Sequence, residues 1–153
     1  MRKVRILFAL LLVGISLGVS AQLTDSAALL LTGTVGQFVA IDVTPAPAAS
    51  ALTLSVAQST PLEVGTVTES SNTAYTVTAG SANGFNFANA GVDQVPYTLW
   101  YDGATVAANG ATVSSGTSAS NVARSVAVTY AAAGVGVATG TYSDTVTFTI
   151  STN

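Results

Sequence analysis

Residues 140–150 have the sequence GTYSDTVTFTI, and this stretch decides the predicted fold. Its apolar side chains fall on one parity, and hydroxyl side chains fill the other: the apolar set is Tyr142, Val146, Phe148 and Ile150. Alternation with period two predicts a β-strand buried on one face. Asp144 shares the inward parity, and an unpaired carboxylate is costly to bury. We therefore expect Asp144 at the entrance of this closing strand, accepting hydrogen bonds from backbone N–H groups or a hydroxyl.

The same alternation recurs along the chain after residue 28. It is present in residues 29–35, 38–44, 52–56, 75–79, 95–102 and 126–130. Turn-forming sequences separate these segments, namely Pro45–Pro47, Glu69–Asn72, Asn83-Gly84, Asp102-Gly103 and Asn109-Gly110. We predict an all-β protein, an immunoglobulin-like sandwich of two antiparallel sheets with about seven strands. Residues 109–121 are small and polar, and we predict a long loop there.

The N-terminus has the pattern of a secretory signal peptide. Arg2, Lys3 and Arg5 precede an apolar run from Ile6 to Val19, and small residues follow at Ser20 and Ala21. The run is shorter than the roughly 20 residues that a spanning helix needs. We predict a signal peptide over residues 1–21 and a single mature domain over residues 22–153. The protein would then be exported to the periplasm, the cell surface or the medium, with no membrane attachment after cleavage.

Composition excludes several classes of function. The chain has no cysteine and no histidine, which removes thiol nucleophiles, histidine-based triads and zinc sites of the usual kind. After residue 21 one cation, Arg124, faces seven carboxylates, a formal balance of −6. Nucleic acids are therefore poor partners. We predict no enzymatic activity, no cofactor and no metal site.

The C-terminal half resembles the spore coat protein U domain, a family related to archaic chaperone–usher pilins. The resemblance rests on PYTLWYDG at residues 96–103, SVAVTY at 125–130 and TGTYSDTVTFTIS at 139–151. TGTVGQFVAIDVTP at residues 32–45 is similar to the family's first strand. Members usually carry cysteines, which this chain lacks. The resemblance implies a sandwich missing one strand, an N-terminal extension of the next subunit that fills the gap, and a periplasmic chaperone as partner.

The segment after the predicted cleavage site supports two interpretations. Ala27, Leu29, Leu31 and Val35 alternate along it. It is either the first strand of a complete domain or a donor strand that pairs with itself or related subunits by β-strand addition. The function we predict is that of an exported structural or adhesive subunit that forms fibres or a coat.

The alternative function is a monomeric secreted module that binds a glycan or peptide. Trp100 lies on the opposite parity from Tyr97 and Tyr101, so its ring could form a platform for a sugar. It could equally pack under a loop or between the sheets. The loop predicted at residues 109–121 would complete such a binding surface.

Overall fold

The computed structural model describes residues 24–90 and 93–153. The predicted signal peptide and its cleavage site lie outside these residues. The chain divides into two units, residues 1–34 and residues 35–153. In the first unit, residues 24–34 are exposed and belong to no strand.

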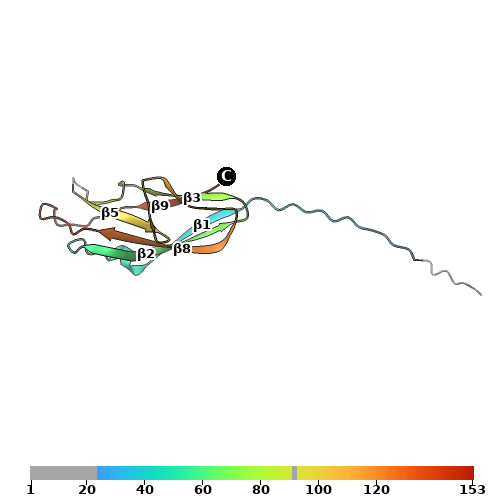
Figure 1. Cartoon of the computed structure of the whole chain (residues 1–153), viewed down its shortest axis with the longest axis horizontal. Coiled ribbons are helices and arrows are strands. Elements are labelled where there is room, and N and C mark those ends of the chain that lie inside the picture. Colours follow the sequence, from blue (N-terminus) through green and yellow to red (C-terminus); the bar gives the residue numbers. More distant parts are fainter. Residues whose placement is uncertain (1–23, 91–92) are drawn as a thin grey trace, which may run out of the picture. The chain divides into compact units, whose positions relative to one another are not determined.

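The second unit is a sandwich of two antiparallel sheets (Figure 1). Its strands in chain order are β1 (Val39–Pro45), β2 (Gln58–Ser71), β3 (Tyr75–Ser81), β4 (Asn86–Ala88), β5 (Gln94–Tyr101), β6 (Ala104–Thr105), β7 (Ala111–Gly116), β8 (Ala119–Tyr130) and β9 (Val146–Thr152), and a 3-10 turn, η1 (Pro47–Ser50), follows β1. One sheet has the order β1-β2-β8-β5-β4, with β6 also paired to β5. The other has the order β7-β3-β9. The predicted fold class, an all-β sandwich of two antiparallel sheets, is confirmed.

The core lies between the two sheets and follows the period-two pattern. In β3 and β5 every second side chain is buried, which is the alternation that the sequence shows. The buried apolar residues are Val67, Tyr75, Val77, Ala79, Phe87, Val95, Tyr97, Leu99, Tyr101, Val126, Val128, Tyr130 and Phe148. Aromatic side chains dominate one region, where Phe87 stacks on Tyr97 at 4.4 Å between ring centroids.

Strand β2 was not predicted from the sequence, and the strand predicted just before it is absent. Residues 52–56 were predicted as a strand, but they form turns, and β2 begins at Gln58. The register of β2 against β8 shifts between Glu63 and Gly65, so the inward parity changes within the strand. A bulge of this kind conceals a strand from any search for strict alternation.

Three further predictions are corrected. Residues 109–121 are not a long loop, because Ala111–Gly116 form β7 and pair with β3. The closing strand β9 begins at Val146, so Tyr142 and Asp144 precede it. Residues 29–35, predicted as a strand, carry no strand assignment.

Candidate strand-addition groove

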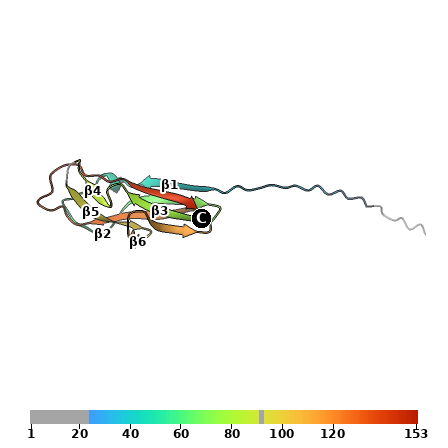
Figure 2. The same ribbon diagram turned by 90° about the horizontal axis from the view of Figure 1, so that it is seen from above.

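The two sheets leave a gap between β1 and β9. β1 pairs with β2, β9 pairs with β3, and no pairing between β1 and β9 occurs in the described part of the chain. The two strands nevertheless approach each other, and Figure 2 shows β9 (red) running alongside β1 (cyan). Each of them therefore presents backbone N–H and C=O groups on a free edge, which can pair with an added strand.

An apolar cavity of about 320 Å³ opens at this gap. Both sheets line it, and the apolar lining is Val43, Pro45, Ala49, Leu52, Val64, Phe87, Leu99, Val126, Val128, Val146 and Phe148. Leu99 and Val128 are core residues, so the cavity reaches the interior of the sandwich. Val43, at the rim, is 47% exposed. We call this cavity, with the free edges of β1 and β9, the β1/β9 groove.

A second, more polar cavity of about 810 Å³ continues from the groove. The two share Ala49, Leu52, Phe87 and Asp144, and the second is bounded mainly by the segment from Ala133 to Ser143. An extended chain segment lying in the groove would thus have room beyond the first residue of β9.

Asp144 lies where the two cavities meet, just before β9. Its carboxylate accepts hydrogen bonds from Ser81 Oγ at 2.5 Å and Tyr97 Oη at 2.6 Å. It also accepts them from the backbone N–H of Asn83 at 3.0 Å and of Thr145 at 2.7 Å. This is the environment of backbone and hydroxyl donors expected from the sequence. Burial, followed by the hydrogen bond to Asp144, raises the pKa of Tyr97 far above its usual value.

Of the other members of the predicted closing strand, Val146, Phe148 and Ile150 lie in β9, and Phe148 is buried. Tyr142 lies in the segment before β9, where its hydroxyl donates to the carbonyl of Ala138 at 2.8 Å. Ser143 makes an isolated antiparallel bridge to Ala88. The segment from Tyr142 to Asp144 is therefore anchored to β4 rather than continuing the sheet.

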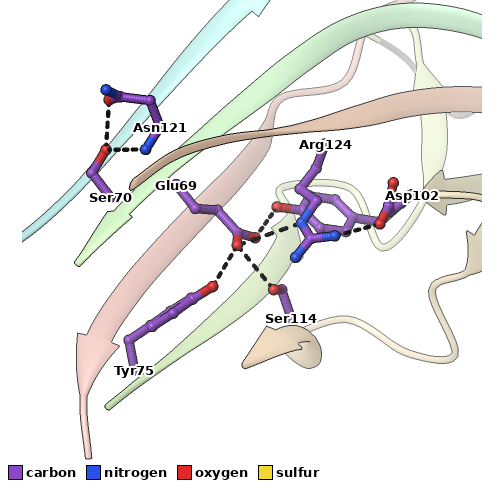
Figure 3. A network of polar contacts seen from close by, with 8 residues as sticks. Glu69, Ser70, Tyr75, Asp102, Ser114, Asn121 and Arg124 are labelled. Carbon is purple, nitrogen blue, oxygen red and sulfur yellow. Dashed lines mark hydrogen bonds and ion pairs between the residues drawn. The ribbon is translucent and has the colours of Figure 1, made fainter. Parts of the chain in front are cut away.

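A buried carboxylate, Glu69, links the two sheets away from the groove. It is completely buried and accepts hydrogen bonds from Tyr75 Oη at 2.9 Å, Tyr101 Oη at 2.6 Å and Ser114 Oγ at 3.0 Å (Figure 3). Tyr101 belongs to the sheet that contains Glu69, whereas Tyr75 and Ser114 belong to the opposite sheet. This cluster was not predicted, because a lone glutamate at the first position of a predicted turn gives no sign of burial.

Arg124 completes the cluster around Glu69. Its Nε lies 3.6 Å from Glu69 Oε2, an ion-pair distance rather than a hydrogen bond, and its Nη1 donates to Asp102 Oδ2 at 2.6 Å. The single cation after residue 21 thus lies beside a buried carboxylate, which would otherwise be costly. Burial, together with the hydrogen bonds to Glu69, raises the pKa values of Tyr75 and Tyr101.

The candidate donor residues lie in an exposed, unpaired stretch. Leu29, Leu30 and Leu31 are 83%, 84% and 82% exposed, and Val35 is 91% exposed. Ala27 is also exposed. A run of apolar side chains this exposed is unusual in a folded monomer.

Trp100, the candidate ligand platform, lies on β5 with its side chain partly buried. Its Nε1 donates to Thr129 Oγ1 on β8 at 3.1 Å, so the indole N–H already has a partner. The loop expected to complete a glycan site is strand β7. The role of Trp100 as a ligand platform stays a prediction, and the loop that was expected to complete the binding surface is a strand instead.

The described residues contain no group of three or more His, Cys, Asp or Glu placed to hold a metal ion, and no helix long and apolar enough to span a membrane. Comparison with family models, curated proteins and solved structures finds no match to this chain. The resemblance to spore coat protein U domains therefore stays a prediction.

Replacing Glu69 with alanine should lower the free energy of unfolding by about 3–5 kcal/mol, since it leaves Arg124 beside buried hydroxyls that have lost their acceptor. Urea denaturation measures the loss. Glu63→Ala is the matched control on the same strand, because Glu63 is exposed, and it should change stability by less than about 0.5 kcal/mol. Equal effects of the two substitutions would show that the Glu69 cluster does not lock the sheets.

Alkaline pH should unfold the protein through its buried tyrosines. The folded-state pKa values of Tyr75, Tyr97 and Tyr101 are raised, so their contribution to stability is full below the unfolded value of about 10 and is lost as pH rises above it. Tyrosinate absorbance and circular dichroism, recorded together, check this. We expect these three side chains to ionise only together with loss of the β signal. Ionisation of these three tyrosines near pH 10 in a folded chain would contradict it.

Proposed function

We propose that this chain is an exported structural subunit that assembles by β-strand addition. The observation that carries the proposal is the β1/β9 groove, in which two free strand edges flank an apolar opening into the core. An added strand would supply backbone hydrogen bonds to the edges and apolar side chains to the cavity. The exposed segment 24–35 of a neighbouring copy is the occupant we propose.

The segment and the groove are chemically complementary. The segment has apolar side chains at Ala27, Leu29, Leu31 and Val35, each two residues apart or a multiple of two. Side chains of an added strand enter a groove at every second position. Burying leucines that are more than four-fifths exposed contributes about 1.5–3 kcal/mol each, and the core gains the cover that it lacks.

Export is part of this proposal and rests on the signal-peptide pattern of residues 1–21. Before assembly the open groove would be prone to pair with any free strand. A periplasmic chaperone that covers it is the partner we propose for that stage. Fibres or a coat at the cell surface would be the product. Fractionation of the native cell with an antibody to the mature chain tests the location, and a purely cytoplasmic signal would oppose the proposal.

Single leucine substitutions in the mature chain test strand addition with a built-in control. Leu29→Asp and Leu31→Asp place a carboxylate in the apolar groove and should abolish oligomers, whereas Leu30→Asp points away from it and should leave them. Size-exclusion chromatography with light scattering measures assembly across a range of concentrations. Equal behaviour of the three variants would contradict the alternating insertion.

Deletion of residues 22–33 tests the donor directly. The truncated chain should stay monomeric, and a synthetic peptide of residues 22–35 should raise its thermal midpoint in a concentration-dependent way, because a ligand that binds only the folded state stabilises it. A full-length mature chain that remains a monomer at high concentration would refute the proposal.

A further inference from the structure

Asn72 holds the chain just before β1 against the end of β2. Its side-chain Oδ1 accepts from the backbone N–H of Phe38 at 2.7 Å, and its Nδ2 donates to the carbonyl of Gly36 at 2.8 Å. Its own backbone N–H donates to the carbonyl of Phe38 at 3.1 Å. We call these three hydrogen bonds the Asn72 clamp.

The clamp continues the β1–β2 ladder after the backbone of β2 has turned away. The last residue pair of that ladder is Val39 with Ser71, and Phe38 with Asn72 is the next position. In an extended strand, the backbone N–H and C=O groups that point toward one neighbouring strand belong to every second residue. The carbonyl of Gly36 and both backbone groups of Phe38 follow this pattern. Residues 36–38 are thus held extended in line with β1.

This geometry bears on where the donor segment of the proposed function can go. The segment is joined to β1, which borders the groove of the same copy. A short tether gives it an effective concentration in the millimolar range for that groove. Without an obstacle, insertion into its own groove would compete strongly with assembly.

Insertion into its own groove requires a hairpin between the segment and β1. If the hairpin had a three-residue loop at residues 35–37, Thr34 would face Phe38. Counting back, Leu31 would then lie opposite Ile41, and Leu29 opposite Val43. Ile41 packs against the core and Val43 lines the groove, so this register places the leucines well. The loop, however, needs the residues that the Asn72 clamp keeps extended.

With the clamp intact, the loop must lie before Gly36. A three-residue loop at residues 33–35 pairs Thr32 with Gly36 and shifts the register by four residues. Asp25 then lies opposite Val43, which places a carboxylate in an apolar groove with no cation to pair it. In this register the leucines lie opposite residues 37–39 and do not reach Val43, which lines the groove.

We propose that the Asn72 clamp is a specificity device that blocks self-insertion and so directs the donor segment to a second copy of this chain. A donor from another copy is free of the tether and can choose the register that places Leu29 and Leu31 in the groove. This inference rests on the proposed function. Asn72 acts here as a positioning residue.

Chromatography combined with limited proteolysis of the full mature chain tests the clamp. Each light-scattering fraction is treated with a protease that cleaves after leucine, so that an inserted segment is protected and a free one is cut. In the wild type we expect protection in oligomers and cleavage in monomers. Asn72→Ala should increase the protected monomer by about tenfold, the factor expected for loss of such hydrogen bonds.

Two further variants make the test specific. Asn153→Ala is the matched control. The backbone N–H of Asn153 donates to the carbonyl of Ala74, near the same turn, and its side chain accepts a hydrogen bond from Thr76. Neither hydrogen bond involves residues 36–38. This variant should behave as the wild type. Asp25→Val keeps Asn72 and places an apolar side chain where the clamped hairpin needs one, so it too should increase the protected monomer even if Asn72→Ala fails to fold.

The outcomes separate the clamp from the proposed function. A protected wild-type monomer would overturn the clamp and leave strand addition standing. So would Asn72→Ala or Asp25→Val variants that are folded and distribute between monomer and oligomer as the wild type does. A segment cleaved in every fraction of the wild type would refute strand addition itself, and the clamp with it.

Discussion

The unpaired gap between β1 and β9 is the constraint on which the rest of this structure depends. A sandwich buries its core fully only if each sheet covers the other to its edges. Here the three-stranded sheet ends at β9, which approaches β1 without pairing with it in the described part of the chain. Val43 and Val146 therefore remain partly exposed beside Leu99 and Val128, which are buried. The apolar core is thus open to solvent at the β1/β9 groove.

Two hydrogen-bonded carboxylates, the buried Glu69 and the partly buried Asp144, connect the sheets of a chain that has no cysteine. Without cysteine there is no disulfide between the sheets. Instead, Glu69 accepts hydrogen bonds from both sheets and Asp144 ties the entrance of β9 to β3 and β5. These hydrogen bonds are directional, whereas apolar packing between two flat faces is not. The two carboxylates therefore help to fix the relative position of the sheets. The sequence predicts the role of Asp144 but gives no sign of the one that Glu69 has.

The parts of the fold that obey simple alternation could be predicted from the sequence, and the parts that break it could not. β3 and β5 were predicted because every second residue is apolar. The turn at Asp102-Gly103 was predicted because these residue types tolerate positive φ, and their φ angles are indeed +48° and +81°. β2 was missed because a bulge changes its parity and because its inward positions include Glu69 and Ser71. β7 was missed because alanine, serine and glycine in a strand look like a loop. The groove exists because β1 and β9 do not pair with each other. The residues of β1 and β9 show no pattern from which this lack of pairing could be predicted.

The proposed donor segment is conspicuous in the sequence, but the sequence does not indicate where it binds. Its alternation of apolar residues is the same whether it completes its own domain or another copy's. In the proposed assembly the two outcomes differ in the direction in which the chain enters β1, and hydrogen bonds from Asn72, in a turn far along the chain, hold that direction. An asparagine in a turn is so common that it carries no signal in a sequence, whereas here its side chain replaces two positions of a β-ladder. In the proposed assembly the tethered segment and the free one compete for the same groove with the same leucines and differ in register, so one polar side chain would decide between folding and assembly.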